Sequence, residues 1–368
     1  MPHPDSTQRH SSSDGRAQSR VLLGPTFADN PYTQRHVDSL RSLGIDVRTL
    51  DNPARLGDEA TSLDQGDVFH LQWAHVFTAG RHLPASVRGT RRLLSTLDGI
   101  RRRGIRVVWT VHNLVHHEAK GGALGPKFQM WAMRQIARRC NALIVHGEHG
   151  AALVRERYRV PDVPIAVVDH PSFIGSYPAE VSQEDARAEL DLPQDATVLA
   201  HVGQLRRYKG VISLINAFKQ TERDNAFLLV AGRISDEPTR RALTEASDSR
   251  IRLHEGFVRD EKLQVFFRAA DAVVLPYARV FTSGSAALAG TFGRAVIAPN
   301  VGCLPDQIGD AGILYPPADR DALPSALQRA MGDRDAIREM GELAWSFAQE
   351  RTWDALAEAV AATYQSGD

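Results

Sequence analysis

DAVVLPYARVFTSGSAALAGTFGRAVIAP, residues 271–299, is the stretch that shows the fold most directly. We expect an apolar strand over 272–275, a small-residue helix that runs to about Phe292, and a second apolar strand over 295–298. The turn before the helix carries Thr282, Ser283, Gly284 and Ser285. The first N–H groups of a helix lack partners within the helix and carry partial positive charge, so this turn is a candidate phosphate site. The alternative is that a hydroxyl group here only caps the helix.

The same alternation of apolar strands and helical segments extends to both sides of this stretch. We expect strands at 21–27, 45–50, 67–73, 105–112, 142–147 and 165–170 in the first half, and at 197–203, 226–232 and 251–257 in the second. Apolar runs without polar alternation are typical of parallel strands covered on both faces. The polar, proline-containing segment 171–196 is typical of a connection between domains. The sequence therefore predicts an α/β fold with two similar halves.

The composition is that of an ordinary globular protein. Its 368 residues include 44 Lys+Arg and 44 Asp+Glu, so a strongly basic surface is not indicated and no nucleic-acid partner is expected. Cys140 and Cys303 lie far apart, which supports neither a zinc site nor a redox motif and agrees with a reducing cytoplasm. Residues 1–20 hold almost no large apolar side chain and are expected to be disordered. We expect neither a membrane span nor a signal peptide.

The loop HVGQLRRYKGV, residues 201–211, follows one expected strand and opens a helix. Ligands collect at such positions in open α/β sheets. Its glycine and cations, Gly203, Arg206, Arg207 and Lys209, suit a diphosphate, although a solvated charge cluster is the plain alternative. The loop does not match GxxxxGK[ST], and no strand is followed by GxGxxG with a later acid. Neither a nucleotide hydrolase nor a dinucleotide oxidoreductase is therefore favoured.

The segment WTVHNLVHHE, residues 109–118, places polar side chains after another expected strand. They are His112, Asn113, His116, His117 and Glu118. Histidine can donate a hydrogen bond to a sugar hydroxyl or accept one from it. A metal site is disfavoured because the adjacent histidines diverge on a helix and HExxH is absent. A structural or surface histidine cluster is the alternative.

Seven motifs follow one another along the chain: NPY (30–32), TVHN (110–113), VGQLRRYKG (202–210), AGR (231–233), HEGFV (254–258), DAVVLPY (271–277) and TSGSAALAGTFGRAVIAP (282–299). In this order they resemble GT-B glycosyltransferases of family 4, and the resemblance covers nearly everything from residue 21 to the end. It implies two facing Rossmann-like domains, an acceptor-binding one at 21–175 and a nucleotide-sugar-binding one at 176–345. The last helix, within 346–368, would return to the first domain.

The resemblance also implies roles for individual residues. His112, Lys209 and Arg206 would be catalytic, with His112 against the donor sugar. The donor diphosphate would be held by Gly203, Arg207, Thr282, Ser283, Gly284 and Ser285, together with Lys209 and Arg206. The nucleobase and ribose would be bordered by Gly232, Arg233, Gly256, Phe257 and Val258. The acceptor-side candidates are Asn30, Tyr32, Asn113, His116, His117 and Glu118.

Three positions depart from the family pattern. Gln204 replaces the arginine of the VGRL motif, and Val280 and Leu288 stand where two glutamates normally hold hydroxyl groups of the donor sugar and ribose. TSGS in this place resembles a branch of exopolysaccharide-type transferases in which backbone amides do more of the holding. A non-catalytic partner subunit and a nucleotide-sugar epimerase remain alternatives.

The expected reaction moves a hexose-type sugar from a UDP- or GDP-sugar to a saccharide hydroxyl, with retention and without a metal or other cofactor. Six arginines, at 91, 92, 101, 102, 103 and 106, and the helix KFQMWAMRQIARR (127–139) favour an anionic membrane surface. A polyprenyl-diphosphate-linked saccharide or a glycolipid is therefore the expected acceptor, within polysaccharide biosynthesis, and the expected location is cytoplasmic and peripheral to the membrane. The alternative is that Phe128, Met130, Trp131, Met133 and Ile136 only pack into the core.

Overall fold

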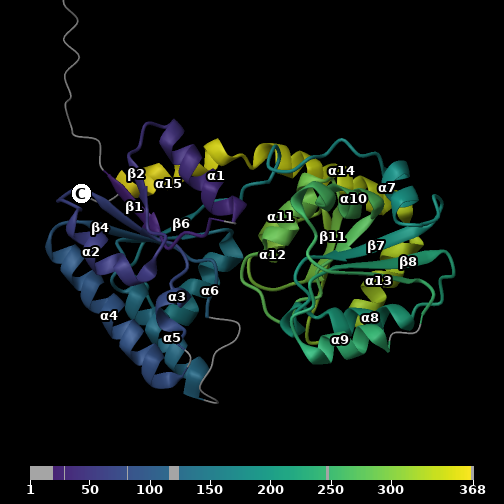
Figure 1. Cartoon of the computed structure of the whole chain (residues 1–368), viewed down its shortest axis with the longest axis horizontal. Coiled ribbons are helices and arrows are strands. Elements are labelled where there is room, and N and C mark those ends of the chain that lie inside the picture. Colours follow the sequence, from purple (N-terminus) through teal and green to yellow (C-terminus); the bar gives the residue numbers. More distant parts are fainter. Residues whose placement is uncertain (1–19, 29, 81, 116–123, 246–247, 366–368) are drawn as a thin grey trace, which may run out of the picture.

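Two six-stranded parallel sheets, each covered by helices on both faces, form the two halves of the protein (Figure 1). The structure, a computed structural model, describes residues 20–28, 30–80, 82–115, 124–245 and 248–365. The predicted α/β class with two Rossmann-like halves is confirmed. No helix within these residues is long and apolar enough to span a bilayer.

The first sheet has the order β2-β1-β3-β4-β5-β6. Its strands are β1 (Val21–Gly24), β2 (Val47–Thr49), β3 (Val68–Leu71), β4 (Arg106–Thr110), β5 (Ala142–Val145) and β6 (Ile165–Val167). The helices are α1 (Pro31–Ser42), α2 (Leu56–Thr61), α3 (His75–Thr78), α4 (Leu83–Arg102), α5 (Leu124–Ala137) and α6 (Glu148–Tyr158), with a 3-10 turn η1 (Pro53–Arg55). Successive strand residues enter separate cores on the two faces, Val107 on one and Val108 on the other. Because both faces of the sheet are buried, its strands are unbroken apolar runs in the sequence.

The second sheet has the order β12-β11-β10-β7-β8-β9. Its strands are β7 (Thr197–Val202), β8 (Ala226–Gly232), β9 (Ile251–Glu255), β10 (Ala272–Val274), β11 (Ala295–Pro299) and β12 (Gly312–Tyr315), the last of which is not among the predicted strands. Helical segments are α7 (Gln183–Glu189), η2 (Arg207–Lys209), α8 (Val211–Lys219), α9 (Glu237–Thr244), α10 (Asp260–Ala269), α11 (Gly284–Thr291), α12 (Leu304–Ile308), α13 (Ala322–Gly332) and α14 (Arg334–Glu350). Because β10 pairs with β7, the loops that follow these strands are neighbours.

The last helix, α15 (Trp353–Gln365), crosses back to the first half and lies along α1 (Figure 1). Leu356, Val360 and Tyr364 pack into the same core as Val21 and Leu40. A second link joins α6 to α12, where the backbone N–H of His149 donates to Asp306 Oδ2 at 3.0 Å. These contacts hold the carboxyl ends of the two sheets opposite each other.

Histidines form a buried polar cluster at the carboxyl edge of the first sheet. Its members come from α1, β3 and the ends of β4, β5 and β6: Tyr32, His36, His70, His112, His146 and His170. His70 Nδ1 lies 2.6 Å from the hydroxyl of Tyr364, and its Nε2 lies 2.7 Å from Thr110 Oγ1. His146 Nδ1 donates to the carbonyl of Val168 at 2.9 Å. Neither ring nitrogen of His36 has a hydrogen-bond partner among the described residues.

Burial keeps these histidines neutral. It lowers the pKa of His36 and His170 to about 3 and that of His146 to about 4, and it lowers the pKa of His112 well below the ordinary value. In the unfolded chain the same groups titrate near 6.5. The unfolded state therefore binds more protons below that pH, and the stability contributed by neutral burial is lost as the pH falls from about 6.5 toward about 3 to 4.

We predict that urea unfolding of the protein becomes easier between pH 7 and pH 5. Each buried histidine should lose about 1.4 kcal/mol of unfolding free energy per pH unit below its unfolded-state pKa. His36→Phe replaces a ring whose nitrogens lack partners, so the pH dependence should become shallower by about one proton. Unfolding curves at several pH values measure this slope. An equal slope in wild type and His36→Phe would show that His36 is not buried in the neutral form.

Candidate functional site

The two loops that were predicted to bind a diphosphate meet in the second half. A pocket of about 110 Å³ lies between the loop after β7 and the start of α11. It is lined by Tyr208, Lys209, Tyr277, Arg279, Val280, Thr282, Ser283, Gly284 and Ser285. No carboxylate is among these described residues. Two segments separated by some seventy residues in sequence thus share one small, cationic site.

Lys209 is held in this pocket by an aromatic side chain. Its Nζ lies 4.8 Å from the centre of the Tyr277 ring and donates to the Tyr277 hydroxyl at 3.3 Å. Burial acts to lower the pKa of Lys209, but its contacts with Tyr277 and Tyr208 outweigh this effect, and the pKa is raised overall. The ammonium group therefore stays protonated. Tyr277 was not singled out from the sequence, although its place three residues after the end of β10 was a usable signal.

Ser283 caps α11 and shapes the other wall of the pocket. Its Oγ accepts from the backbone N–H of Ala286 at 3.2 Å and lies 3.2 Å from the Tyr277 hydroxyl. The side chain of Gln307 fixes the Ser283 backbone, accepting from its N–H at 3.0 Å and donating to its carbonyl at 3.3 Å. Ser283 therefore caps the helix, as the alternative interpretation of this turn predicts. It does not use the N–H groups of Gly284 and Ser285, which have no acceptor among the described residues.

Three glycines form a row at the carboxyl ends of β7, β8 and β9. Gly203, Gly232 and Gly256 have φ values of 132°, 149° and 137°. A Cβ on Gly232 would lie 1.7 Å from the Gly203 carbonyl oxygen, so these loops approach as closely as only glycine allows. A Cβ on Gly203 or Gly256 would meet no atom within 4 Å, so both face open space. Beside the row, Phe257 is 78% exposed.

The other predicted residues of this half lie around the same edge. The backbone N–H of Arg207 donates to Asp236 Oδ2 at 3.1 Å, and Arg206 stands just before η2. Neither arginine lines the 110 Å³ pocket. Arg233 is exposed after β8, and Val258 packs against the core. The predicted residues therefore lie at one edge of the sheet, and the structure places Lys209 rather than the arginines at the helix end.

On the first half, His112 belongs to the buried histidine cluster. Its ring stacks on Trp73 with centroids 4.7 Å apart, and its Nε2 donates to Gln72 Oε1 at 2.7 Å. Only 7% of its surface is exposed. Gln72 was missed because nothing in its local sequence marks it.

The acceptor-side candidates are divided among several roles. Asn30 caps α1 by accepting from the N–H of Tyr32 at 3.0 Å, and Tyr32 is buried among the histidines. The carbonyl of Asn113 accepts from Tyr158 at 3.3 Å. His116, His117 and Glu118 lie outside the described residues. Within the described ranges, no three His, Cys, Asp or Glu side chains come together as a metal site would require.

A larger, mainly apolar pocket of about 670 Å³ lies between the halves. The first half contributes Leu114, Val115, Met130, His149, Ala152, Leu153, Glu156 and Arg157, and the second contributes Ala278, Arg279, Val280, Phe281, Asn300, Val301, Gly302 and Pro305. Arg279 and Val280 line both this pocket and the smaller one, so the two adjoin. Sequence reasoning missed this cavity because no single segment encodes it.

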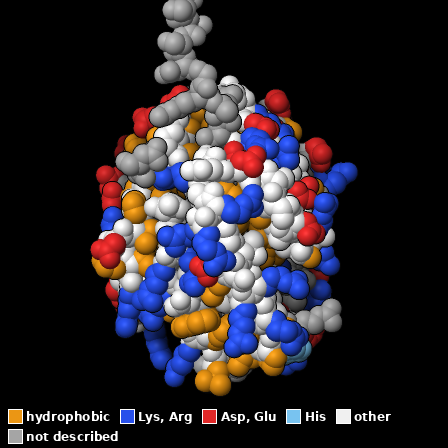
Figure 2. Space-filling model, turned by 90° about the vertical axis from the view of Figure 1, so that its left-hand side faces the viewer, with side chains coloured by type: hydrophobic (Ala, Val, Ile, Leu, Met, Phe, Trp, Pro, Cys, Tyr) orange, Lys and Arg blue, Asp and Glu red, His pale blue; other side chains and the backbone are white. Residues whose placement is uncertain are grey.

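The basic residues of the first half lie on an outer face. Figure 2 shows Lys and Arg side chains gathered over the lower part of this face, with hydrophobic side chains at its lower edge. Arg91, Arg92, Arg101, Arg102 and Arg103 are exposed, and Arg103 also donates to the carbonyl of Ala60 at 2.8 Å. On α5, Met133 and Ile136 are core residues, but Trp131 is 46% exposed. Contact with an anionic membrane surface stays a prediction, which the exposed residues favour.

Each half of the chain matches a family model of known glycosyltransferases. A family model described as Glycosyltransferase Family 4 matches residues 31–171, and one described as Glycosyl transferases group 1 matches residues 196–333. The D-inositol 3-phosphate glycosyltransferase of Corynebacterium urealyticum is 28% identical over 71% of this chain and 66% of its own length. The GDP-mannose:glycolipid 4-beta-D-mannosyltransferase of Xanthomonas campestris pv. campestris is 25% identical over 81% of this chain and 78% of its own.

Solved structures share the fold at low sequence identity. Sucrose-phosphate synthase from Thermosynechococcus elongatus superposes with a TM-score of 0.72 at 20% identity, covering 95% of this chain and 98% of that one. Anabaena HepE in complex with UDP superposes with a TM-score of 0.69 at 14% identity, covering 95% and 100%. With one family model on each half and this shared architecture, the chain belongs to the GT-B glycosyltransferases of family 4 type.

Proposed function

We propose that this glycosyltransferase moves a hexose-type sugar from a UDP- or GDP-sugar to a hydroxyl group of a glycolipid or lipid-linked saccharide. The observation that carries the proposal is the adjoining pair of pockets, a small cationic one and a larger apolar one that share Val280. The names of the relatives agree with such substrates, since one includes GDP-mannose and a glycolipid, and HepE was solved with UDP.

In this proposal the diphosphate of the donor lies against Lys209 and the N–H groups of Gly284 and Ser285. A protonated amine and a helix N-terminus both stabilise the negative charge that develops on a departing phosphate. The described residues of this pocket supply cationic and hydroxyl groups and no carboxylate, so they favour direct binding of phosphate over binding through a metal ion. The nucleobase would lie along the glycine row, with Phe257 available for stacking.

The transfer step then follows without a protein carboxylate. The bond between the anomeric carbon and the leaving phosphate oxygen breaks while the acceptor oxygen bonds to that carbon from the same face. The acceptor proton passes to the leaving phosphate oxygen. His112 is neutral, so we assign it hydrogen bonding to the donor sugar rather than proton transfer. Its Nε2 is committed to Gln72, which leaves Nδ1 for a sugar hydroxyl.

A non-catalytic partner subunit is the second candidate. The observation that favours it is the apolar side chain of Val280, which lines both pockets where the family pattern places a carboxylate. Loss of a charge-assisted hydrogen bond costs about 1.5 to 3 kcal/mol, so hydroxyl recognition must come from other groups.

The purified chain should turn over a nucleotide sugar with a glycolipid acceptor in the presence of EDTA. The product should keep the anomeric configuration of the donor, because the acceptor attacks the face that the phosphate leaves. Product NMR and release of nucleoside diphosphate measure both properties. Absence of turnover with UDP- and GDP-sugars alike would favour the partner-subunit function, and loss of activity in EDTA would overturn metal independence.

Lys209→Ala should weaken binding of the preferred nucleoside diphosphate by about ten- to a hundredfold, because it removes a charge-assisted contact. Lys219→Ala, on exposed Lys219 at the end of α8, is the matched control and should bind like the wild type. Thermal shifts with UDP, GDP and their sugars report the effect, since a ligand at 100 times its dissociation constant stabilises by about 2.7 kcal/mol. An unchanged response in Lys209→Ala would remove Lys209 from the diphosphate site.

Ala152→Trp should fill part of the apolar pocket from α6, where Ala152 is exposed. We expect a raised KM for an acceptor with an apolar chain and little change in donor affinity, because Ala152 does not line the donor pocket. Ala355→Trp, at an exposed position of α15, is the control. Initial rates at varied acceptor concentration distinguish the two variants. If the acceptor KM were the same in both, the apolar pocket would not hold the acceptor.

A further inference from the structure

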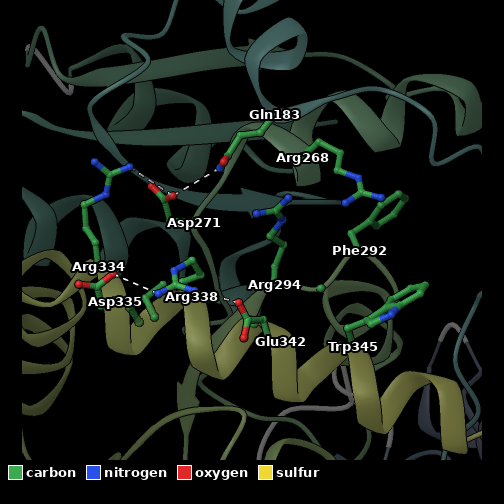
Figure 3. Close-up of a pocket in the computed structure, with 13 residues that line it drawn as sticks. Gln183, Arg268, Asp271, Phe292, Arg294, Arg334, Asp335, Arg338, Glu342 and Trp345 are labelled. Atoms are coloured by element: carbon green, nitrogen blue, oxygen red, sulfur yellow. Dashed lines mark hydrogen bonds and ion pairs between the residues drawn. The ribbon is translucent and has the colours of Figure 1, made fainter.

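A second large pocket, of about 640 Å³, is lined by residues of the second half (Figure 3). It lies at the opposite edge of the second sheet from the pocket that contains Lys209. Asp271 and Arg294 line it directly before β10 and β11 begin, and α14 forms another wall. The five residues of β11, at about 3.3 Å each, separate this amino edge from the carboxyl edge where donor residues gather. A molecule bound here is therefore not a substrate of the transfer reaction.

Four arginines line the pocket, and two of them already have anionic partners. Arg338 pairs with Asp335 at 3.3 Å and with Glu342 at 3.0 Å. Arg334 donates to the carbonyl of Asp195 at 2.7 Å and lies 3.9 Å from Asp271.

The carboxylate of Asp271 is itself largely committed. Its Oδ2 accepts from Arg187 at 2.9 Å and from the backbone N–H of Val198 at 2.7 Å. Its Oδ1 accepts from Gln183 at 3.4 Å. Asp271 still attracts Arg294 electrostatically, but burial and the positive charge of Arg268 outweigh this attraction in lowering the pKa of Arg294.

Arg268 and Arg294 form no ion pair with any described residue, although one Nη of Arg268 donates to the carbonyl of Ala179 at 3.1 Å. In each, Nε is buried and has no hydrogen-bond partner among the described residues. Burial, followed by the positive charge of Arg268, lowers the pKa of Arg294 to about 10. In Figure 3 both guanidinium groups turn into the pocket, and no dashed line reaches Arg294. Two half-buried guanidinium groups of the same charge repel each other, and an anion bound between them would relieve this repulsion.

We propose that this pocket binds a phosphorylated sugar or a similar phosphorylated polyol, with the phosphate group between Arg268 and Arg294. The planar guanidinium group matches phosphate through paired hydrogen bonds. A bare anion does not account for the rest of the lining. Asp335 and Glu342 at the rim can accept hydrogen bonds from hydroxyl groups, and Trp345, 37% exposed, offers a flat apolar surface to a sugar ring.

The test must separate this site from the donor site, which also attracts phosphate. The full-length Lys209→Ala protein, weakened at the donor pocket, is titrated calorimetrically with glucose 6-phosphate, inorganic phosphate and glucose. We expect glucose 6-phosphate to bind at one site, phosphate to bind there more weakly, and glucose not to bind. Arg294→Gln in this background should weaken binding of glucose 6-phosphate about tenfold or more.

Two further arginine variants, one outside the pocket and one inside it, complete the test. Arg241→Gln makes the same change at an exposed position of α9, outside the pocket, and should leave binding unchanged. Arg268→Gln should weaken binding as Arg294→Gln does, and it provides a second variant if one of them folds poorly. No binding of glucose 6-phosphate at millimolar concentration, or equal binding by both pocket variants and Arg241→Gln, would overturn the proposal. Inorganic phosphate that binds more tightly than glucose 6-phosphate would also overturn the proposal, because the pocket would then bind the anion without recognising the sugar.

Discussion

The contact between the Lys209 ammonium group, the Tyr277 ring and the Ser283 hydroxyl organises the functional edge of the second half. It brings together a loop after β7 and a helix start after β10, which the pairing of these two strands makes neighbours. These two segments approach so closely that a Cβ on Gly210, where φ is 76°, would lie 1.8 Å from the Pro276 carbonyl oxygen. Among the described residues no carboxylate forms an ion pair with Lys209, which lines the 110 Å³ pocket.

The rest of the molecule places the first half opposite this contact. Helix α15 anchors the second half to α1, and the bond between His149 and Asp306 joins α6 to α12. The apolar pocket arises between these links, and Val280 connects it with the phosphate pocket. An alcohol that carries an apolar chain can therefore be placed beside a leaving diphosphate while both halves exclude water.

Local patterns predicted the elements well, because strands such as β5 and β11 are continuous apolar runs buried on both faces. They also predicted that the loops after β7 and β10 carry glycine, cations and hydroxyl residues at one edge of the sheet, where the structure places both loops around one pocket. Local patterns could not predict contacts between segments that lie far apart in the sequence. Gln307 fixes Ser283 from another loop, and Gln72 orients His112 from the neighbouring strand. Strand β12, four residues long, was not predicted, although it is no shorter and no more exposed than β6, which was.

The central claim is best tested by a crystal structure of the protein with its preferred nucleoside diphosphate. The account predicts phosphate density within hydrogen-bonding distance of Lys209 Nζ and of the N–H groups of Gly284 and Ser285, with the base along Gly203, Gly232 and Gly256. Density for the nucleotide elsewhere, for example between Arg268 and Arg294 with Lys209 untouched, would contradict it.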